Sequence, residues 1–123
     1  MTQTEHDVEQ VGAGNAAEIA RRFIEAIDAR DVDGLRALAT EDVEFRNRQG
    51  RSFHGYDGAR DVVRAAEHSG LLLVATGRAQ IDDGGSRLSL PVSVVLGRDR
   101  LTGTAEFRIR DGKVAAFEVV TEQ

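Results

Sequence analysis

The sequence predicts an α+β domain in which three N-terminal helices pack on the concave face of a cone-shaped, curved antiparallel sheet. Three observations support this fold class. Apolar residues recur at helical spacing in three segments of the N-terminal half. The C-terminal half instead alternates apolar and polar residues in long stretches separated by turn signals. The 123 residues, 41% of them hydrophobic, suffice for one core but not for two domains.

The three helices are predicted in order along the first half of the chain. Asn15 is a candidate N-cap, and the helix that follows it ends near Arg30. Asp31 caps a shorter helix, from about residue 32 to 39, which forms a tight hairpin with the first. A third helix covers residues 58–68 and ends at a Ser-Gly pair.

Five strands are predicted before and after the third helix. Residues 43–48 alternate with period two, which places Val43, Phe45 and Asn47 on one face. The other four strands are separated by turns rich in Gly and Asp, and they cover residues 71–82, 86–97, 100–110 and 113–121.

Turn lengths predict how the last three strands pair. A two-residue turn at 98–99 sets Leu90 opposite Phe107. A three-residue loop in the last hairpin sets Ala105 opposite Phe117, and this choice keeps the following glutamate out of the core. The outer face of the sheet then carries Ser89, Pro91, Ser93, Val95, Thr102, Thr104, Glu106, Arg108, Ala116, Glu118 and Val120.

Composition excludes several classes of function. With 16 basic residues against 21 acidic ones, the chain has no basic excess for nucleic-acid binding. No apolar run approaches the ~20 residues that span a bilayer, and the polar start is unlike a signal peptide. We therefore expect a cytoplasmic protein without a membrane partner. The chain has no cysteine and only three dispersed histidines, so we expect neither a metal nor a cofactor.

The chain divides into a tail and one domain. Residues 1–14 lack periodicity and include a small, flexible Val-Gly-Ala-Gly run, so they are expected to form a disordered tail. Residues 15–123 are expected to form the single domain. The basic residues are Arg except for Lys113, which is typical of a GC-rich bacterial coding sequence.

The order of the elements and four segments resemble a known superfamily. Residues 20–35 and 38–45 carry the helical hairpin and the strand after it, 53–60 lead into the third helix, and 110–114 form the final hairpin. Together they resemble the nuclear-transport-factor-2-like superfamily, in particular its SnoaL-like branch, over about residues 16–121. The resemblance implies a cone-shaped fold with a pocket between the helices and the concave face. It implies no particular activity, because this superfold hosts enzymes, ligand binders and interaction domains.

Two catalytic sets of the superfamily can be compared with this chain residue by residue. The steroid-isomerase-like set falls on Phe23, Asn47 and Ala105, which offer neither an acidic donor nor a base. Of the epoxide-hydrolase-like set only Asn47 matches, because Phe45 replaces the tyrosine and Val119 replaces the final-strand aspartate. Its arginine–aspartate pair is kept in neither register of the middle strand. The polyketide-cyclase branch relies on acidic pocket groups, and the inward positions of the last three strands hold none.

The resemblance therefore predicts a binder of a small hydrophobic molecule that lacks these catalytic acids. Asn47 either anchors a ligand in the pocket or binds loop backbone at the end of its strand. His54 and Tyr56 lie in the loop at the expected pocket mouth. One alternative is a small-molecule enzyme of polyketide cyclase, isomerase or epoxide hydrolase type that uses these three residues. A second is a structural dimerisation module whose pocket is filled by its own side chains. The predicted pocket lining is Phe23, Ile27, Phe45, Asn47, His54, Tyr56, Ala105, Phe107, Phe117 and Val119.

The outer face of the sheet predicts a homodimer. It mixes hydroxyl and apolar side chains and lacks the dense charge of a wholly solvated face, while the helices should cover the other side. A two-fold axis would set the patch against itself, so that Arg108 of one subunit neutralises Glu106 or Glu118 of the other. The predicted dimer face is Ser93, Val95, Thr104, Glu106, Arg108, Glu118 and Val120.

Overall fold

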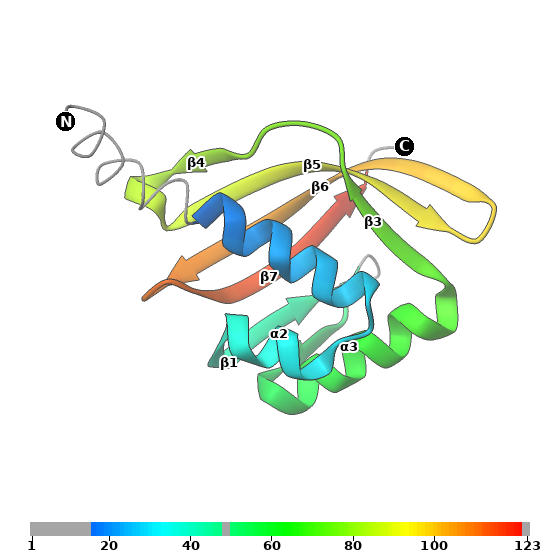
Figure 1. Cartoon of the computed structure of the whole chain (residues 1–123), viewed down its shortest axis with the longest axis horizontal. Helices are drawn as coiled ribbons and strands as arrows, with labels where there is room; N and C mark the ends of the chain where they lie inside the picture. The colour runs from blue at the N-terminus through cyan, green and yellow to red at the C-terminus, as the bar shows by residue number, and fades with distance from the viewer. Residues whose placement is uncertain (1–15, 48–49, 122–123) are drawn as a thin grey trace.

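The computed structural model describes residues 16–47 and 50–121, and the expected tail over residues 1–14 lies outside this part. Three helices lie on one face of a curved seven-stranded sheet that does not close (Figure 1). The predicted α+β class is confirmed. The elements in chain order are a first helix at 16–28, α2 Val32–Leu38, β1 Ala39–Arg46, β2 Ser52–His54, α3 Gly55–Ser69, β3 Leu71–Ala75, β4 Gln80–Asp82, a 3-10 turn Asp83–Gly85, β5 Arg87–Leu96, β6 Asp99–Arg110 and β7 Lys113–Thr121.

The sheet is mixed rather than wholly antiparallel. Its strands follow the order β2-β1-β7-β6-β5-β3, with β4 also paired to β5. Every pair is antiparallel except β1 and β7, which run parallel and bring Phe45 level with Phe117. The strand β2, which the sequence analysis left as loop, pairs with β1 and extends the sheet at this edge. The three-helix layer therefore covers a sheet whose middle is formed by the chain's C-terminal strands.

A side chain caps the start of helix α2, and a glycine ends helix α3. The side chain of Asp31 caps α2 as predicted, and its Oδ1 accepts a hydrogen bond from Gly34 N at 2.9 Å. Helix α3 begins at Gly55, three residues earlier than predicted. It ends where Gly70 takes the left-handed conformation at φ +70°, which glycine adopts without strain.

Two side chains at the C-terminal end of the first helix bind the edge of β3 that faces away from β5. Oδ1 of Asp28 accepts a hydrogen bond from Leu73 N at 2.9 Å, and Arg30 donates to the carbonyl of Leu71 at 2.8 Å. Burial raises the pKa of Asp28, while the Leu73 N–H and the Arg30 guanidinium partly offset this rise. These contacts satisfy backbone groups on the edge of β3 that no strand pairs.

The predicted strand over 71–82 is two strands, because its partner contains a proline. Both β3 and β4 pair with β5, through Ala75 opposite Val92 and Gln80 opposite Ser89. Between these positions lies Pro91, which has no N–H to donate and therefore interrupts the ladder. Only its carbonyl is used here, accepting from Thr76 N at 2.9 Å.

Both predicted hairpin registers are wrong, although the faces they assign are as predicted. The β5–β6 turn is at 97–98, because Gly97 supplies the left-handed φ of +62°, and Phe107 pairs with Leu88. In the last hairpin the turn has two residues, Asp111 and Gly112, and a bulge then shifts the pairing by one residue. The bulge brings Phe107 opposite Phe117, so the hairpin keeps its glutamate outside the core by a different route.

The core lies between the helices and the sheet, and it is wholly apolar. Among the residues that the structure describes, none that is polar or charged is buried. The largest fully buried side chains are Phe23, Phe45, Ile27, Leu35, Leu88, Leu90, Val43, Val92, Val94 and Val114. Within the described ranges, no helix combines the length and the apolar character needed to cross a bilayer.

Candidate functional site

Four phenylalanines occupy the interior where a ligand pocket was predicted. Phe23 of the first helix lies against Phe45, Phe107 and Phe117, with ring centroids 5.8, 5.9 and 5.2 Å away. The rings of Phe107 and Phe117 are 5.0 Å apart. These distances are those of directly packed aromatic pairs, and all four side chains are buried. The rings therefore form a continuous core at the centre of the concave face.

The other residues of the predicted pocket fall into two groups. Ile27 and Ala105 are buried in the same core, and Val119 is half-buried on β7. His54 and Tyr56 lie at the start of α3, and both are exposed. The structure thus brings the apolar members together and leaves the two titratable members at the surface.

Asn47 closes the loop between β1 and β2. Its side-chain Oδ1 accepts a hydrogen bond from Arg51 N at 2.9 Å, and its backbone N–H donates to the Arg51 carbonyl, also at 2.9 Å. The side chain is half-buried. Two roles were considered for this amide, a ligand anchor and a contact to loop backbone. These bonds are the ones expected for the contact to loop backbone.

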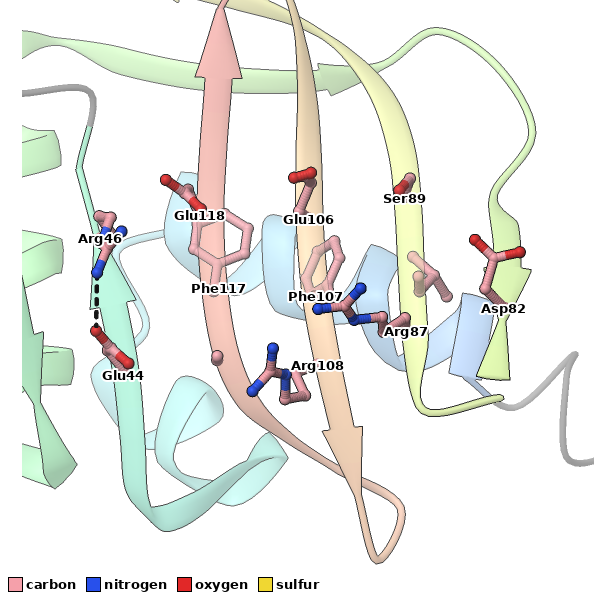
Figure 2. A pocket seen from close by; sticks show the side chains of 12 residues that line it. Glu44, Arg46, Asp82, Arg87, Ser89, Glu106, Phe107, Arg108, Phe117 and Glu118 are labelled. Carbon is pink, nitrogen blue, oxygen red and sulfur yellow. Dashed lines mark ion pairs between the residues drawn. The ribbon is translucent and has the colours of Figure 1, made fainter. Parts of the chain in front are cut away.

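A hollow of about 360 Å³ lies on the opposite, outer face of the sheet. Figure 2 looks onto this face, with charged side chains pointing toward the viewer and the helices behind the strands. The hollow is lined by Glu44, Arg46, Asp82, Arg87, Leu88, Ser89, Glu106, Phe107, Arg108, Ala116, Phe117 and Glu118. Of the two faces of the sheet, the one that carries no helix is therefore the one that presents charged side chains.

Two pairs of like charges face each other across neighbouring strands of the hollow. Glu106 lies directly opposite Glu118, and Arg108 lies directly opposite Arg87. Within residues 16–47 and 50–121, the side chains of Glu106, Glu118 and Arg108 make no hydrogen bond or ion pair. Like charges placed directly opposite across two strands repel each other. Glu118 has Arg46 on its other side, on β1, and Arg87 has Asp82 on its other side, on β4. Glu106 and Arg108 are therefore the two charges of the hollow that have no opposite charge beside them on a neighbouring strand.

The far half of the same face is more apolar. Val120 is 45% exposed, and beyond it Leu72 and Val74 of β3 are 42% and 51% exposed. Register places Leu72 opposite Val95 and Val74 opposite Ser93, both members of the predicted dimer face. The sequence analysis missed the two β3 residues, because an unbroken apolar run shows no alternation from which a face can be read.

The sequence analysis also missed one ion pair at the rim of the hollow. Glu44 and Arg46 lie on β1, whose period-two pattern did place them away from the core, and their side chains pair at 3.7 Å. The parallel pairing of β1 with β7 brings this pair beside Ala116 and Glu118. No group of three His, Asp, Glu or Cys side chains that could hold a metal ion occurs in the described ranges.

Comparison with known proteins agrees with the fold. Residues 20–117 match the sequence model of the SnoaL-like domain. No protein of curated function matches the sequence. Among solved structures, Bal32a from a soil-derived mobile gene cassette superposes with a TM-score of 0.77 at 19% identity, covering 91% of this chain and 92% of its own.

Two further structures carry the names of enzymes. A protein provisionally described as a ketosteroid isomerase, from Kribbella flavida, has a TM-score of 0.72 and 23% identity over 89% of this chain and 79% of its own. An LEH-like epoxide hydrolase from M. tuberculosis has a TM-score of 0.67 and 16% identity, over 89% of this chain and 84% of its own. Likeness at these identities supports the shared fold alone.

Proposed function

The chain belongs to the SnoaL-like domain family, and from this premise we propose that it functions as a homodimerisation domain whose outer sheet face binds a second copy. One observation carries the proposal. The concave face is filled by its own phenylalanines, whereas the outer face has exposed apolar side chains and two charges without an opposite charge beside them, and no described helix covers it. A partner that covers such a face would bury its apolar side chains.

A small hydrophobic molecule in the interior, the function that the resemblance implied first, has less support. Phe23 stacks 5.8 Å from Phe45 and lies 5.2 Å from Phe117, so a ligand would have to displace an aromatic ring from a packed core. Such a displacement would cost the contacts that the ring makes on three sides.

An enzyme of the kinds named among the structural neighbours has less support as well. Their chemistry needs an ionisable group within hydrogen-bond reach of a substrate. The interior of the described part buries no polar or charged residue. The set of Asn47, His54 and Tyr56 offers one amide bound to its own loop and two exposed side chains.

The outer face is suited to a stable dimer in both size and chemistry. It spans β1, β7, β6, β5 and β3, and a standard interface needs only about 800 Å² from each partner. Exposed Val120, Val74 and Leu72 supply apolar contact area, and the charges of the hollow supply specificity.

Analytical ultracentrifugation at micromolar concentration tests the proposal. We expect a mass of twice 13.3 kDa for the wild type. The double variant Val95→Arg/Val120→Arg places like charges in the interface and should shift the mass to that of the monomer. Its matched control, Ala37→Arg/Ala65→Arg, adds the same charge at exposed helix positions and should remain dimeric.

Two results would contradict the proposal. A wild-type mass of 13.3 kDa up to 100 µM, well above the ~1 µM dissociation constant of an ordinary association, would exclude a functional dimer. A dimer that tolerates both arginines on the sheet but not those on the helices would place the interface on the helical side.

A further inference from the structure

We propose that the two-fold axis of this dimer crosses the strands between two charged rows of the outer face, so that Arg108 of each copy lies over the Glu106–Glu118 pair of the other. The inference rests on the proposed dimer and adds its register. It is drawn from the cross-strand pairing and from Glu106 and Arg108, the two charges of the hollow with no opposite charge beside them on a neighbouring strand.

The rows follow directly from the strand register. The arginine row runs across the sheet through Glu44, Ala116, Arg108, Arg87 and Asp82. The glutamate row, two residues along each strand, runs through Arg46, Glu118, Glu106, Ser89 and Gln80. The rows are roughly 6.8 Å apart, the rise of two residues in an antiparallel strand. Figure 2 shows the charged members of both rows on the outer face of the sheet.

Each row contains one pair of like charges within one copy, and this pair leaves Glu106 and Arg108 without an opposite charge beside them. Glu106 and Glu118 face each other as neighbours on β6 and β7, and the two arginines face each other on β6 and β5. Cross-strand neighbours lie about 5 Å apart, so like charges at these positions repel. A partner that presents a cation to the glutamates and a carboxylate to Arg108 would relieve both repulsions.

Symmetry lets a second copy supply both charges. A two-fold axis that lies in the interface and runs across the strands exchanges the two rows and sets each strand against itself. It brings Arg108 over Glu106 of the partner subunit, and the same contact forms a second time in reverse. Because sheets twist, two facing sheets separate toward their edges. The two copies therefore lie closest at the middle strands, β6 and β7.

An axis parallel to the strands gives the opposite result where it runs beside β6, the strand that carries Glu106 and Arg108. It keeps each row over itself, so that placing it between β6 and β7 sets Glu106 over Glu118 of the partner subunit. Placing it between β6 and β5 sets Arg108 over Arg87 of the partner subunit. Both placements bring like charges together, which costs association free energy.

A second copy is favoured over a small zwitterion as the occupant. The side chains of the hollow are largely open to water, and an exposed ion pair contributes little there. A second sheet excludes water from the contact and makes each pair twice, so the same charges interact more strongly.

A charge exchange measured by ultracentrifugation tests the register. Glu106→Arg places an arginine against Arg108 of the partner subunit, and Arg108→Glu places a glutamate against Glu106. We expect each single variant to raise the dimer dissociation constant at least tenfold. The double variant Glu106→Arg/Arg108→Glu exchanges the two charges and should return it to within about threefold of wild type, the usual scatter of such contributions. The matched controls Glu67→Arg and Arg64→Glu make the same changes at exposed positions of α3 and should leave it unchanged.

Mixing the two single variants gives a second, independent readout. The register predicts that a Glu106→Arg chain and an Arg108→Glu chain form a heterodimer, although neither forms a homodimer at the same concentration. This complementation also shows that both variants are folded. Native mass spectrometry resolves the two homodimers from the heterodimer by mass.

The outcomes separate the register from the dimer itself. A monomeric wild type would overturn both. Suppose that neither single variant raises the dissociation constant and that mixing them gives no preference for the heterodimer, whereas Val74→Arg dissociates the dimer. The axis would then lie in the apolar half of the face. That result would overturn the register and leave the proposed dimerisation intact.

Discussion

The two faces of this sheet are built by the same strands and differ in every other respect. On β6, Ala105 and Phe107 point into a core in which the described residues bury no polar group, while Glu106 and Arg108, which alternate with them, point into a charged hollow. In this family fold the concave face is where a ligand was expected. Here four packed phenylalanine rings occupy the concave face, and the exposed charged and apolar side chains of the proposed dimer interface lie on the outer face.

Removing one ring from the concave face gives the largest expected effect. Phe23→Ala deletes the side chain that contacts three other rings, and such a truncation in a packed core costs about 3–5 kcal/mol. Val120→Ala, on the exposed outer face, should stay within about 0.5 kcal/mol in the monomer. Urea denaturation at low protein concentration measures both.

The same variant distinguishes a filled interior from a ligand pocket. An apolar cavity of the size of a phenyl ring binds benzene, so we expect benzene to raise the thermal midpoint of Phe23→Ala and not that of the wild type. A wild type that is stabilised by benzene, together with a Phe23→Ala variant that costs under 1 kcal/mol, would show that the interior has free space.

The division into two faces was predictable from the sequence, whereas pairing and packing were not. Alternation along β5 and β6 fixed which side chains point inward, and a slip of two residues leaves that alternation unchanged. The turn at Gly97 could therefore move the register without altering any face. The parallel contact between β1 and β7 joins segments about 70 residues apart, and no local pattern reports such a pairing.

The sequence predicted which phenylalanines meet in the interior, but not whether they line a pocket or fill it. Phe23, Phe45, Phe107 and Phe117 were correctly placed together, yet side chains that line a pocket and side chains that fill it have the same pattern. The 5.0–5.9 Å separations of their rings, which are those of packed aromatic pairs, favour the filled interior. On the outer face the individual charges were predicted, but the opposition of Glu106 and Glu118 depends on a bulge that the sequence did not reveal.

The edge of the sheet, between the two faces, should give an intermediate effect. Asp28→Ala leaves the Leu73 N–H without its acceptor, which costs about 1–3 kcal/mol for a group withdrawn from water. Asp28→Asn keeps an acceptor oxygen and removes the charge that burial disfavours, so its stability at pH 7 should equal or exceed that of the wild type. Chemical denaturation of the three proteins gives the comparison.

The pH dependence of the same residue has a definite sign. Because burial raises the pKa of Asp28 above 3.8, the native state takes up this proton before the unfolded state does. The wild type should therefore gain stability relative to Asp28→Asn as the pH falls from 7, and the gain is complete below 3.8. If the wild type instead loses stability relative to Asp28→Asn as the pH falls, the hydrogen bond from Leu73 and the charge of Arg30 outweigh burial.

The smallest expected effect is at the open rim of β1, where Asp42 accepts hydrogen bonds from the Thr40 hydroxyl and from Arg110. These bonds lower the pKa of Asp42 below 3.8, the Thr40 bond most. Its contribution to stability is present above 3.8 and is lost as the pH falls through the lowered value. An NMR titration of the Asp42 carboxyl should show the pKa rising toward 3.8 in Thr40→Val, and rising less in Arg110→Ala. Because the carboxyl is open to solvent, which screens the pair, both variants should unfold at nearly the wild-type temperature at pH 7. A marked loss of stability in Arg110→Ala would instead show that this surface pair holds β6 to β1.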